Sequence, residues 1–479
     1  AGNALLIVCL NLVVKCIYLF GIDRTVQNVL PEGEYGLFFT LYNFAFLFQI
    51  VADLGLQQYN LRTLSQSRQL LGKYLPYLLG LRLLLGLGFV LLTVGLGWLW
   101  GFRSSFEWWL LFGIAFNQVL QTGVVFLRSN LSGLGWYRLD SWVSVLDKLL
   151  LVLIGAVLLW PTWRSSFQLT WFILAHTLAY SLSIIVIVSL LWPRLTRLRP
   201  AFSWAKTRAI LRQSLPFALV VFLMTAYTRL DAIMIEKLLA EGAVEADRYA
   251  SAFRLLDASN IAGYLLAGLL LPMFARLLQT GESVRPLVRL GVGTLGVGSI
   301  TLGISCWYFA TPIMESLYEN GSAYTGDILR WLMLGFIPMS VAYVYGSLLA
   351  ANASLRPLNI LFASSIPLNI ILNAWLIPRA GAVGAAQATF WTQAIAALGQ
   401  IWLAYRIMKL HVQPELIGRF VGFVLLLGGA GYGLLSATWP LPWWLGFVLL
   451  LVTGLVLAFV FKLLELRTWL DLARAKTGS

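Results

Sequence analysis

Apolar segments recur along the whole chain and are separated by short polar breaks. Each segment holds about 20 residues, which is enough for a helix to cross a hydrocarbon core roughly 30 Å thick. The pattern predicts about fourteen helical spans. We place them near residues 4–22, 37–60, 74–100, 106–128, 141–160, 168–192, 213–238, 250–275, 287–310, 327–350, 357–377, 384–407, 418–438 and 442–462. The predicted fold class is therefore an all-α polytopic membrane protein without a soluble domain.

The composition agrees with this interpretation. With 59% hydrophobic and 11% charged residues, the chain of 479 residues is too apolar for a soluble domain of its size. The first span is interrupted by Lys15 and no small-residue cleavage site follows, so we expect a retained helix and not a signal peptide. The three cysteines lie within spans and the two histidines are far apart, at Cys9, Cys16, Cys306, His176 and His411. We therefore expect no disulfide framework, metal site or cofactor.

The formal net charge of +14 comes from 34 basic and 20 acidic residues. With an inside N-terminus, most basic residues fall in the even-numbered loops and the C-terminal tail, among them Arg62, Arg68, Lys73, Arg194, Arg197, Arg199, Arg276, Arg285 and Arg406. By the positive-inside rule, this bias predicts that both termini are cytoplasmic. Because the charges follow helix ends and form no single patch, they indicate topology and anionic lipid contact, not nucleic-acid binding.

An internal repeat relates the second span to the eighth. The segments VLPEGEYG and LLAEGAVEADRYA are acidic turns that end in Tyr plus a small residue, just before an aromatic-rich helix. The same number of residues separates Tyr35 from Arg62 and Tyr249 from Arg276. The third and ninth spans both follow a proline and are both rich in glycine, which permits close helix approach.

The repeat unit is about six helices, an even number, so the two halves should be related by an axis along the membrane normal. We expect pseudo-symmetric six-helix lobes at residues 1–192 and 213–410, with a cytoplasmic linker at residues 193–212. Residues 411–479 supply an extra helix pair and a cytoplasmic tail. Two such lobes with a site at their interface are usual in alternating-access transporters, and spans 1, 2, 7 and 8 should line the cavity. The alternative is a duplicated membrane protein that does not transport.

Four segments carry a resemblance to a known family, namely YGLFFTLYNFAFLFQIVADLGL, TRLDAIMI, RYASAFRLLD and LNIILNAWLIPRAGAVGAAQAT. From about residue 5 to residue 410, the chain resembles the polysaccharide-export (Wzx-type oligosaccharide flippase) branch of the multidrug/oligosaccharidyl-lipid/polysaccharide exporter superfamily. The resemblance implies a flippase that moves undecaprenyl-diphosphate-linked oligosaccharide from the cytoplasmic to the outer leaflet of a bacterial inner membrane. It implies as partners the lipid-linked oligosaccharide, membrane lipids, a polysaccharide polymerase and glycosyltransferases, and we expect a monomer. In related lipid II flippases, the last helix pair borders a groove for the lipid tail.

Five basic residues are candidates for binding the substrate diphosphate: Lys15, Arg24, Arg82, Arg229 and Arg254. Lys15 lies about 16 Å into the first span and Arg229 about 20 Å into the seventh, on helices that the repeat makes counterparts. A charge at the bilayer centre costs roughly 2.5–3.5 kcal/mol, so each must face a polar cavity or a partner. Because Lys and Arg donate charge-assisted hydrogen bonds to phosphate oxygens, we expect these two to hold the diphosphate in turn as the lobes rock.

Interhelical ion pairs are the structural alternative, with Asp53, Asp147, Asp231 or Asp257 as partners. Arg254 and Asp257 are three residues apart and can neutralise one another on one helix face. Arg229 and Asp231 point to opposite sides, and Lys148 is adjacent to Asp147, so neither pair should be satisfied within its helix. Asp53, Asp231 and Asp257 are also candidates for ion coupling.

Amide side chains in the spans could bond sugar hydroxyls, although hydrogen bonding between helices explains most of them. They are Asn11, Asn43, Gln49, Asn117, Gln118, Gln121, Asn260, Asn369, Asn373, Gln387 and Gln393.

Other functions compete with the export of a lipid-linked oligosaccharide. A lipid II flippase would use the same diphosphate chemistry. A cation-coupled drug exporter of the same superfamily would favour acidic residues in its cavity, since its substrates are mostly cationic. A membrane glycosyltransferase or polysaccharide polymerase needs catalytic acids or bases in a sizeable outer loop or cleft. The outside loops here are short, so we expect a transporter and not an enzyme.

Overall fold

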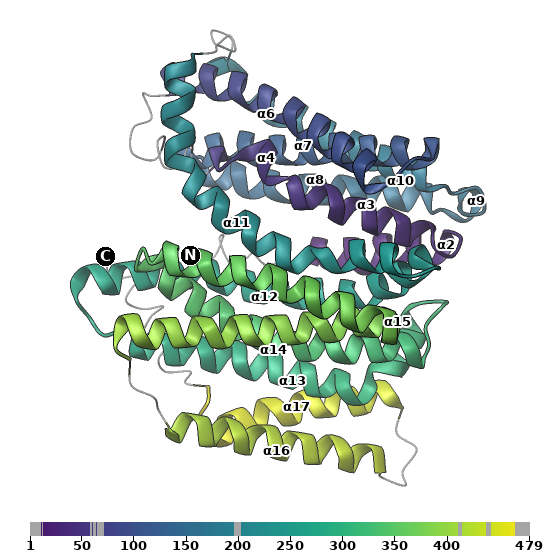
Figure 1. Ribbon diagram of the computed structural model, residues 1–479, viewed down its shortest axis with the longest axis vertical. Helices are drawn as coiled ribbons and strands as arrows, with labels where there is room; N and C mark the ends of the chain where they lie inside the picture. Colours follow the sequence, from purple (N-terminus) through teal and green to yellow (C-terminus); the bar gives the residue numbers. More distant parts are fainter. Residues whose placement is uncertain are drawn as a thin grey trace. The chain divides into compact units, whose positions relative to one another are not determined.

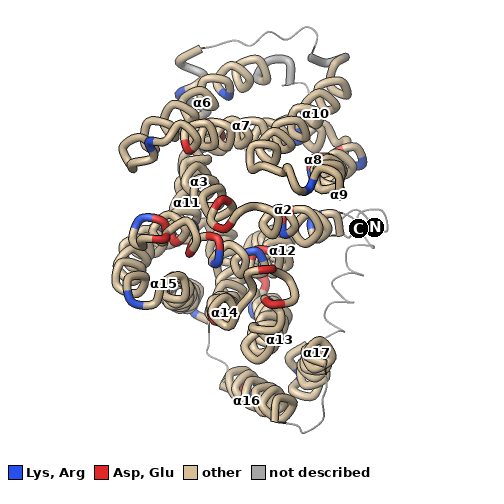
Figure 2. The backbone as a smooth tube through the Cα atoms, turned by 90° about the vertical axis from the view of Figure 1, so that its right-hand side faces the viewer, with Lys and Arg blue, Asp and Glu red and all other residues tan. Residues whose placement is uncertain are grey.

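The computed structural model describes residues 11, 13–57, 60, 64, 71–195, 203–410, 414–436 and 442–464. Every regular element in these ranges is a helix (Figure 1), so the all-α fold class is confirmed. By length and composition, 10 of the described helices could each cross a membrane. Charged residues occupy few positions along the backbone (Figure 2). Several residues singled out in the sequence lie outside the described ranges, namely Cys9, Arg62, Arg68, Arg197, Arg199 and His411.

The chain divides into two compact units, Ala1–Asp247 and Arg248–Ser479. The first unit contains η1 (Ile17–Asp23), α2 (Arg24–Val29), α3 (Glu34–Phe48), α4 (Ile50–Asp53), α6 (Leu71–Trp100), α7 (Ser105–Gly133), α8 (Tyr137–Leu158), α9 (Pro161–Arg164), α10 (Leu169–Leu195) and α11 (Trp204–Leu238). These helices coincide with the second to seventh predicted spans, and the first span is described only at residue 11 and from residue 13 onward. α11 begins inside the predicted linker and packs against α3. α11 therefore belongs to the first compact unit, whereas the sequence repeat puts the same helix, span 7, at the start of the second lobe. The limits of the lobes stay a prediction.

The remaining helices coincide with the last seven predicted spans. They are α12 (Gly242–Thr280), α13 (Arg285–Leu317), α14 (Ala323–Ala351), α15 (Leu355–Met408), α16 (Pro414–Ser436) and α17 (Trp443–Val460). α12 begins in the first unit and runs into the second.

α15 contains two predicted spans, 357–377 and 384–407, and its helical backbone is broken at one residue between them. Gly381 has a φ of 59° and a ψ of −139°, which breaks the 54-residue helix. This left-handed φ suits glycine, because a Cβ there would be strained. After the break, the backbone N–H of Ala382 donates to the hydroxyl of Tyr324 at 2.9 Å. A proline, Pro378, lies shortly before the break.

The second span is interrupted, unlike its repeat counterpart. α3 ends at Phe48, α4 ends at Asp53, and Leu54 and Gly55 follow with φ values of 43° and 79°. α12 instead runs for 39 residues as one helix. The sequence repeat predicted helices of the same length for the second and eighth spans. The interruption of the second span is therefore a feature that the eighth span does not share. A leucine in left-handed backbone is strained, and packing around it must hold it there.

The last helix pair packs on α13, so it is not an isolated hairpin. Glycines of both helices lie against α13. A Cβ on Gly431 of α16 would lie 2.2 Å from a ring carbon of Tyr308, and one on Gly454 of α17 would lie 2.5 Å from Thr301. These contacts are the close approaches that small residues permit between membrane helices.

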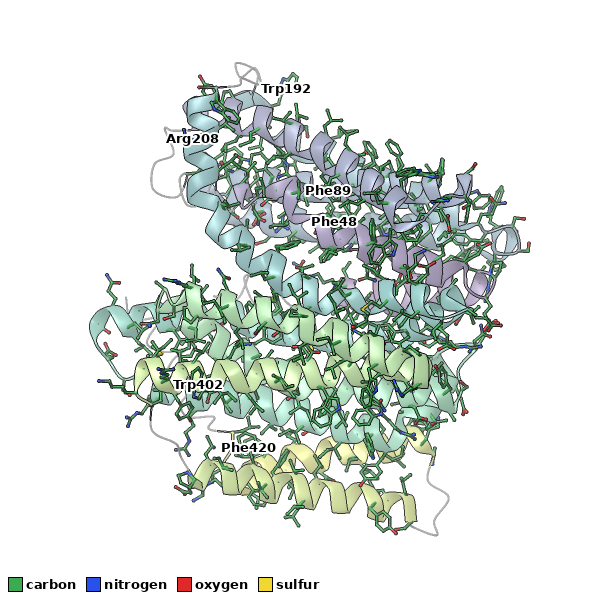
Figure 3. The ribbon with its side chains drawn as sticks, in the orientation of Figure 1. Phe48, Phe89, Trp192, Arg208, Trp402 and Phe420 are labelled. Carbon is green, nitrogen blue, oxygen red and sulfur yellow. The ribbon has the colours of Figure 1, made fainter. Side chains whose placement is uncertain are left out.

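Large apolar side chains lie both in the interior and on the outer surface of the helices (Figure 3). Phe89 of α6 is fully buried, at 0% exposure, whereas Trp192 of α10 and Trp402 of α15 are 59% and 56% exposed. Many other large apolar side chains are exposed on the described helices. Such an extensive apolar surface fits contact with lipid.

Candidate functional site

Lys15 lies in the helical segment directly before the π-helix η1, and its side chain is exposed. The charged groups that act on it are Lys148 and Asp147 of α8 and Arg128 of α7. Arg128 donates to the carboxylate of Asp140 at 2.9 Å. Among the described residues, Asp147 is the carboxylate that acts on both Lys15 and Lys148, which lie inside predicted membrane spans.

Lys148 is surrounded by aromatic rings. Its Nζ lies 4.8 Å from the ring centre of Tyr18 and 5.7 Å from that of Tyr180, distances at which a cation is attracted to an aromatic face. The same Nζ is 3.9 Å from Asp147 Oδ2, a long ion pair without a hydrogen bond. The sequence argued that adjacent residues do not satisfy one another, and this distance shows a weak direct contact at most.

His176 links Tyr18 to the backbone of α10. Its Nδ1 lies 2.9 Å from the carbonyl oxygen of Phe172, and because a carbonyl only accepts, Nδ1 is the donor. In a neutral imidazole, Nε2 is then an acceptor, and the hydroxyl of Tyr18 donates to it at 3.0 Å. We call Lys15, Tyr18, Asp147, Lys148, His176 and Tyr180 the Lys148 cluster. Lys148, Tyr18, His176 and Tyr180 were not among the predicted site residues, because the sequence alone does not show which spans pack together.

Arg229 lies in α11 and faces α3. One guanidinium nitrogen, Nη1, donates to Asn43 Oδ1 at 3.4 Å, and the guanidinium carbon lies 5.1 Å from the ring centre of Phe46. Asp231 is 2% exposed and lies two residues further along α11. These contacts differ from those of Lys15, so the structure places the two predicted phosphate ligands in different surroundings within the first unit.

Arg82 forms an interhelical ion pair. A guanidinium nitrogen lies 2.8 Å from Asp53 Oδ1, and the guanidinium carbon lies 5.0 Å from the ring centre of Phe126. The side chains of Arg82 and Asp53 are 10% and 19% exposed, so water screens the pair little. The sequence analysis named an interhelical ion pair as the alternative to substrate or ion binding for Arg82 and Asp53, and this geometry is such an ion pair.

Three further predicted residues lie in α2 and α12. Arg24 is partly exposed in α2, while Arg254 and Asp257 are half-buried in α12. Arg254 belongs to the second unit, whereas the other four candidate cations belong to the first. Among the described residues, no group of three or more His, Cys, Asp or Glu side chains could hold a metal ion.

Several predicted sugar ligands bond to other helices instead. Asn11 donates to Ser144 Oγ at 2.9 Å, and Asn117 donates to the carbonyl of Ile173 at 2.9 Å. These two bonds connect different helices, as the structural interpretation of the amides predicted. In α15, Asn373 instead donates to Asn369 Oδ1 of the same helix at 3.0 Å.

The acidic turns of the repeat contain a feature that the sequence reasoning missed. Asp247 accepts hydrogen bonds from Gln27 Nε2 at 2.6 Å and from the backbone N–H of Gly33 at 3.1 Å. Close to it, the hydroxyl of Tyr35 donates to Asp23 Oδ1 at 3.0 Å. Asp247 lies in the acidic turn that the sequence repeat identified. Its hydrogen-bond partners could not be read from the sequence, because they lie more than two hundred residues earlier.

Comparison with known proteins gives a family and a fold. Residues 3–278 match a family model described as polysaccharide biosynthesis protein. Over 122 residues, 25% of the chain, it is 31% identical to the lipid III flippases of Escherichia coli (strain K12) and Shigella flexneri. The matched stretch covers 28% of the length of these curated relatives.

Solved structures share the fold at low identity. The lipid II flippase MurJ in an inward closed conformation aligns with a TM-score of 0.65 and 15% identity, covering 95% of this chain and 98% of that one. An inward-facing multidrug resistance MATE family transporter of the MOP superfamily aligns with a TM-score of 0.63 and 13% identity, covering 82% and 94%. At these identities, the similarity shows the fold alone.

Proposed function

The chain belongs to the polysaccharide biosynthesis protein family, and from this membership we propose that it is a flippase for undecaprenyl-diphosphate-linked oligosaccharide. The expected place in the multidrug/oligosaccharidyl-lipid/polysaccharide exporter superfamily is confirmed. The relatives and structural neighbours are flippases and transporters by name, in agreement with a protein that is not an enzyme. The multi-pass membrane location rests on the helices and on these relatives.

In the proposed cycle, the substrate moves from the cytoplasmic to the outer leaflet of a bacterial inner membrane by alternating access. Both termini are cytoplasmic in this proposal, following the distribution of Lys and Arg. The proposed partners are the lipid-linked oligosaccharide, membrane lipids, and a polymerase with glycosyltransferases, and the proposed state is a monomer.

The Lys148 cluster is the observation that carries the proposal. Lys15 and Lys148 lie near one carboxylate, Asp147, among helices that are otherwise apolar. Excess positive charge in a membrane span costs free energy unless an anion or water compensates it. A diphosphate supplies several acceptor oxygens and negative charge, so it complements this cluster better than a neutral or cationic solute does.

Arg229 is the proposed second ligand of the diphosphate. Its guanidinium is oriented by Asn43 and by the ring of Phe46, and a planar guanidinium can donate two parallel hydrogen bonds to one phosphate. We propose that Lys15 and Arg229 hold the diphosphate in turn during the cycle. Arg24 and Arg254 remain proposed auxiliary ligands.

Arg82 takes a different role in the refined proposal. Its ion pair with Asp53 joins α6 to the end of α4, so we assign it to the structure of the first unit and not to substrate binding. Asp231 and Asp257 stay proposed ion-coupling residues.

The cluster favours this substrate class over that of a drug exporter. MATE transporters share the fold, but a cavity for cationic drugs would be expected to present carboxylates, whereas Lys15 and Lys148 present ammonium groups. A lipid II flippase would also need a cation for its diphosphate, so only the sugar distinguishes it, and export assays with defined lipid-linked sugars separate the two.

The test compares transport with membrane abundance. We expect Lys15→Ala to reduce flipping of a lipid-linked oligosaccharide in proteoliposomes by roughly tenfold or more, because a charge-assisted hydrogen bond to phosphate is lost. Lys15→Arg should keep part of the activity. The matched control is Lys237→Ala, which removes a lysine at the end of α11 that lies over Phe102. Normal transport by a well-expressed Lys15→Ala protein would overturn the assignment of Lys15.

A further inference from the structure

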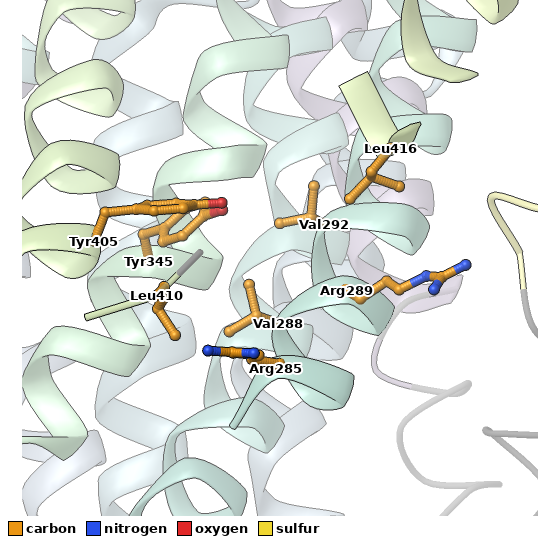
Figure 4. A pocket seen from close by; sticks show the side chains of 8 residues that line it. All are labelled: Arg285, Val288, Arg289, Val292, Tyr345, Tyr405, Leu410 and Leu416. Atoms are coloured by element: carbon orange, nitrogen blue, oxygen red, sulfur yellow. The ribbon is translucent and has the colours of Figure 1, made fainter. Parts of the chain in front are cut away.

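A small open pocket in the second unit contains two arginines that do not act together. Arg285 and Arg289 of α13 line it with Tyr345 of α14 and Tyr405 of α15 (Figure 4). The two guanidinium groups extend in opposite directions, so they do not present their donors to a common point. The Lys148 cluster of the first unit differs in this respect, because several of its side chains surround a single ammonium group.

The contacts of the Lys148 ammonium group leave its hydrogen-bond donors unused. The Lys148 side chain is 20% exposed, and Nζ lies over the rings of Tyr18 and Tyr180. Among the described residues, none accepts a hydrogen bond from Nζ, and the carboxylate of Asp147 is 3.9 Å away. An ammonium group has three N–H donors. Aromatic rings therefore place this cation while its donors stay open to a ligand.

His176 fixes the position of Tyr18. The Tyr18 hydroxyl donates to His176 Nε2 at 3.0 Å, and Nδ1 of the same imidazole donates to the carbonyl oxygen of Phe172 at 2.9 Å. The imidazole also packs edge-on against the rings of Tyr18 and Phe172, with centroids 6.2 Å and 4.5 Å away. These contacts connect a side chain of η1 to the backbone of α10.

The local backbone brings Tyr18 close to Lys15. Tyr18 lies in the π-helix η1, and π-helical turns are frequent at functional sites. Lys15 precedes Tyr18 by three residues, so the two side chains are neighbours on one face of the helical segment. The charge of Lys148 also acts on Lys15. Lys148 therefore shares its surroundings with the lysine that is already a proposed ligand of the diphosphate.

We propose that Tyr18, Tyr180 and His176 are positioning residues, which hold the Lys148 ammonium group as a further ligand of the substrate diphosphate. This role rests on the proposed function, since the ligand is the same diphosphate. The faces of the two tyrosine rings attract the ammonium group, and His176 keeps one of these rings in place. Lysine has a flexible four-carbon stem, so restricting it in advance lowers the ordering cost of binding.

The experiment measures binding of farnesyl diphosphate to the full-length protein in detergent by isothermal titration. This short isoprenyl diphosphate is the probe, and farnesol, which lacks the phosphates, is the reference ligand. We expect Lys148→Ala to weaken farnesyl diphosphate binding roughly tenfold or more, because a charge-assisted hydrogen bond is lost. Tyr18→Phe keeps the ring but loses the hydrogen bond to His176, so it should weaken binding roughly threefold to tenfold.

The matched control removes a different tyrosine hydroxyl. Tyr308 lies in the second unit, and its hydroxyl donates to the carbonyl oxygen of Gly428 at 2.8 Å. Tyr308→Phe therefore loses one hydrogen bond of the same kind, and we expect it to bind farnesyl diphosphate as tightly as the original protein. An equal loss of affinity in Tyr308→Phe and Tyr18→Phe would contradict a specific role of Tyr18.

Substitutions in a second background separate positioning from general stability. Because Tyr18 and His176 are proposed to act through Lys148, Tyr18→Phe and His176→Ala should each weaken binding in the original protein but cause no further loss in Lys148→Ala. Size-exclusion chromatography identifies the variants that stay folded, and Tyr18→Phe preserves the packing of the ring if His176→Ala does not fold. The same loss of affinity in both backgrounds would overturn the positioning role.

The reference ligand separates this inference from the proposed function. If the original protein prefers farnesyl diphosphate to farnesol and Tyr18→Phe binds the diphosphate equally well, the positioning role is wrong while the proposed function stands. If the original protein binds farnesyl diphosphate no better than farnesol, the diphosphate site itself is wrong, and the positioning role falls with it.

Discussion

Asp247 holds Gln27 by a hydrogen bond of 2.6 Å from the side-chain amide to a carboxylate oxygen. The other carboxylate oxygen accepts from the backbone N–H of Gly33 at 3.1 Å. Gln27 and Asp247 are 9% and 7% exposed, so water competes little for these bonds. The turn that precedes α3 is thus fastened to the first turns of α12, and these are the two acidic turns of the sequence repeat.

Replacing Asp247 should weaken this attachment. In Asp247→Ala, the amide of Gln27 and the N–H of Gly33 lose a charged acceptor, and a buried polar group left unsatisfied costs about 1–3 kcal/mol. We expect a lower midpoint of thermal unfolding in detergent. Asp247→Asn keeps one acceptor oxygen and should lose less stability. Equal unfolding midpoints for Asp247→Ala and the unchanged protein would show that the bonds contribute nothing measurable.

A substitution at Gly36 tests the packing of the same turn against the start of α12. A Cβ on Gly36 would lie 1.9 Å from the carbonyl oxygen of Ala243, so Gly36→Ala must push the start of α12 away. Overpacking of this kind costs about 1–3 kcal/mol. Gly88→Ala is the control, because nothing lies within 4 Å of a Cβ there. A disulfide engineered between positions 27 and 247 should form more slowly in Gly36→Ala than in Gly88→Ala, and equal rates would contradict the clash.

The pair of Arg82 and Asp53 should respond to single and double substitution in opposite ways. Removing one partner leaves an uncompensated charge among apolar side chains, which costs about 3–5 kcal/mol. We therefore expect Arg82→Met and Asp53→Leu each to reduce the amount of folded protein in the membrane. The double variant should recover much of the loss, because apolar replacements of both partners can be tolerated. Additive losses would mean that the two side chains do not depend on one another.

Arg229 should behave differently from Arg82. Arg229 donates to Asn43 and lies over the ring of Phe46, and as a proposed ligand of the diphosphate it should be required for export, so Arg229→Ala should abolish export by protein that still reaches the membrane. Arg229→Lys should retain part of the activity, since the charge persists without the planar guanidinium. Quantitative immunoblotting of membranes beside an export assay measures both effects. Loss of the protein itself would instead assign Arg229 to the structure.

The positions of the helices could be predicted because each needs an apolar segment of about 20 residues, which hydropathy detects directly. The break at Gly381 also had a local cause, since Pro378 and a glycine with positive φ lie close together. The interruption at Leu54 had no such signal. Leucine has no intrinsic preference for a φ of 43°, so contacts formed only in the folded protein must impose it.

The sequence predicts the kind of residue that forms the candidate site, but it does not predict which residues that side chain contacts. An isolated lysine in an apolar span indicates function or pairing, and that inference needs only the sequence around Lys15. The choice between the two outcomes needs the packing of helices. Asp53 lies 29 residues from Arg82, and helical periodicity, which relates residues three or four apart, does not identify such a partner. The rings around Lys148 come from two other spans for the same reason.

The single-residue break at Gly381 also bears on how this protein is made. Its two helices, 54 residues in all, leave the ribosome as nearly continuous apolar chain, so we expect them to enter the bilayer together as one hairpin. An epitope inserted at position 381 would have to be carried across the membrane before the second helix could insert, and it should block biogenesis. The turn at Gly101, which already separates α6 from α7, is the better place for a topology reporter.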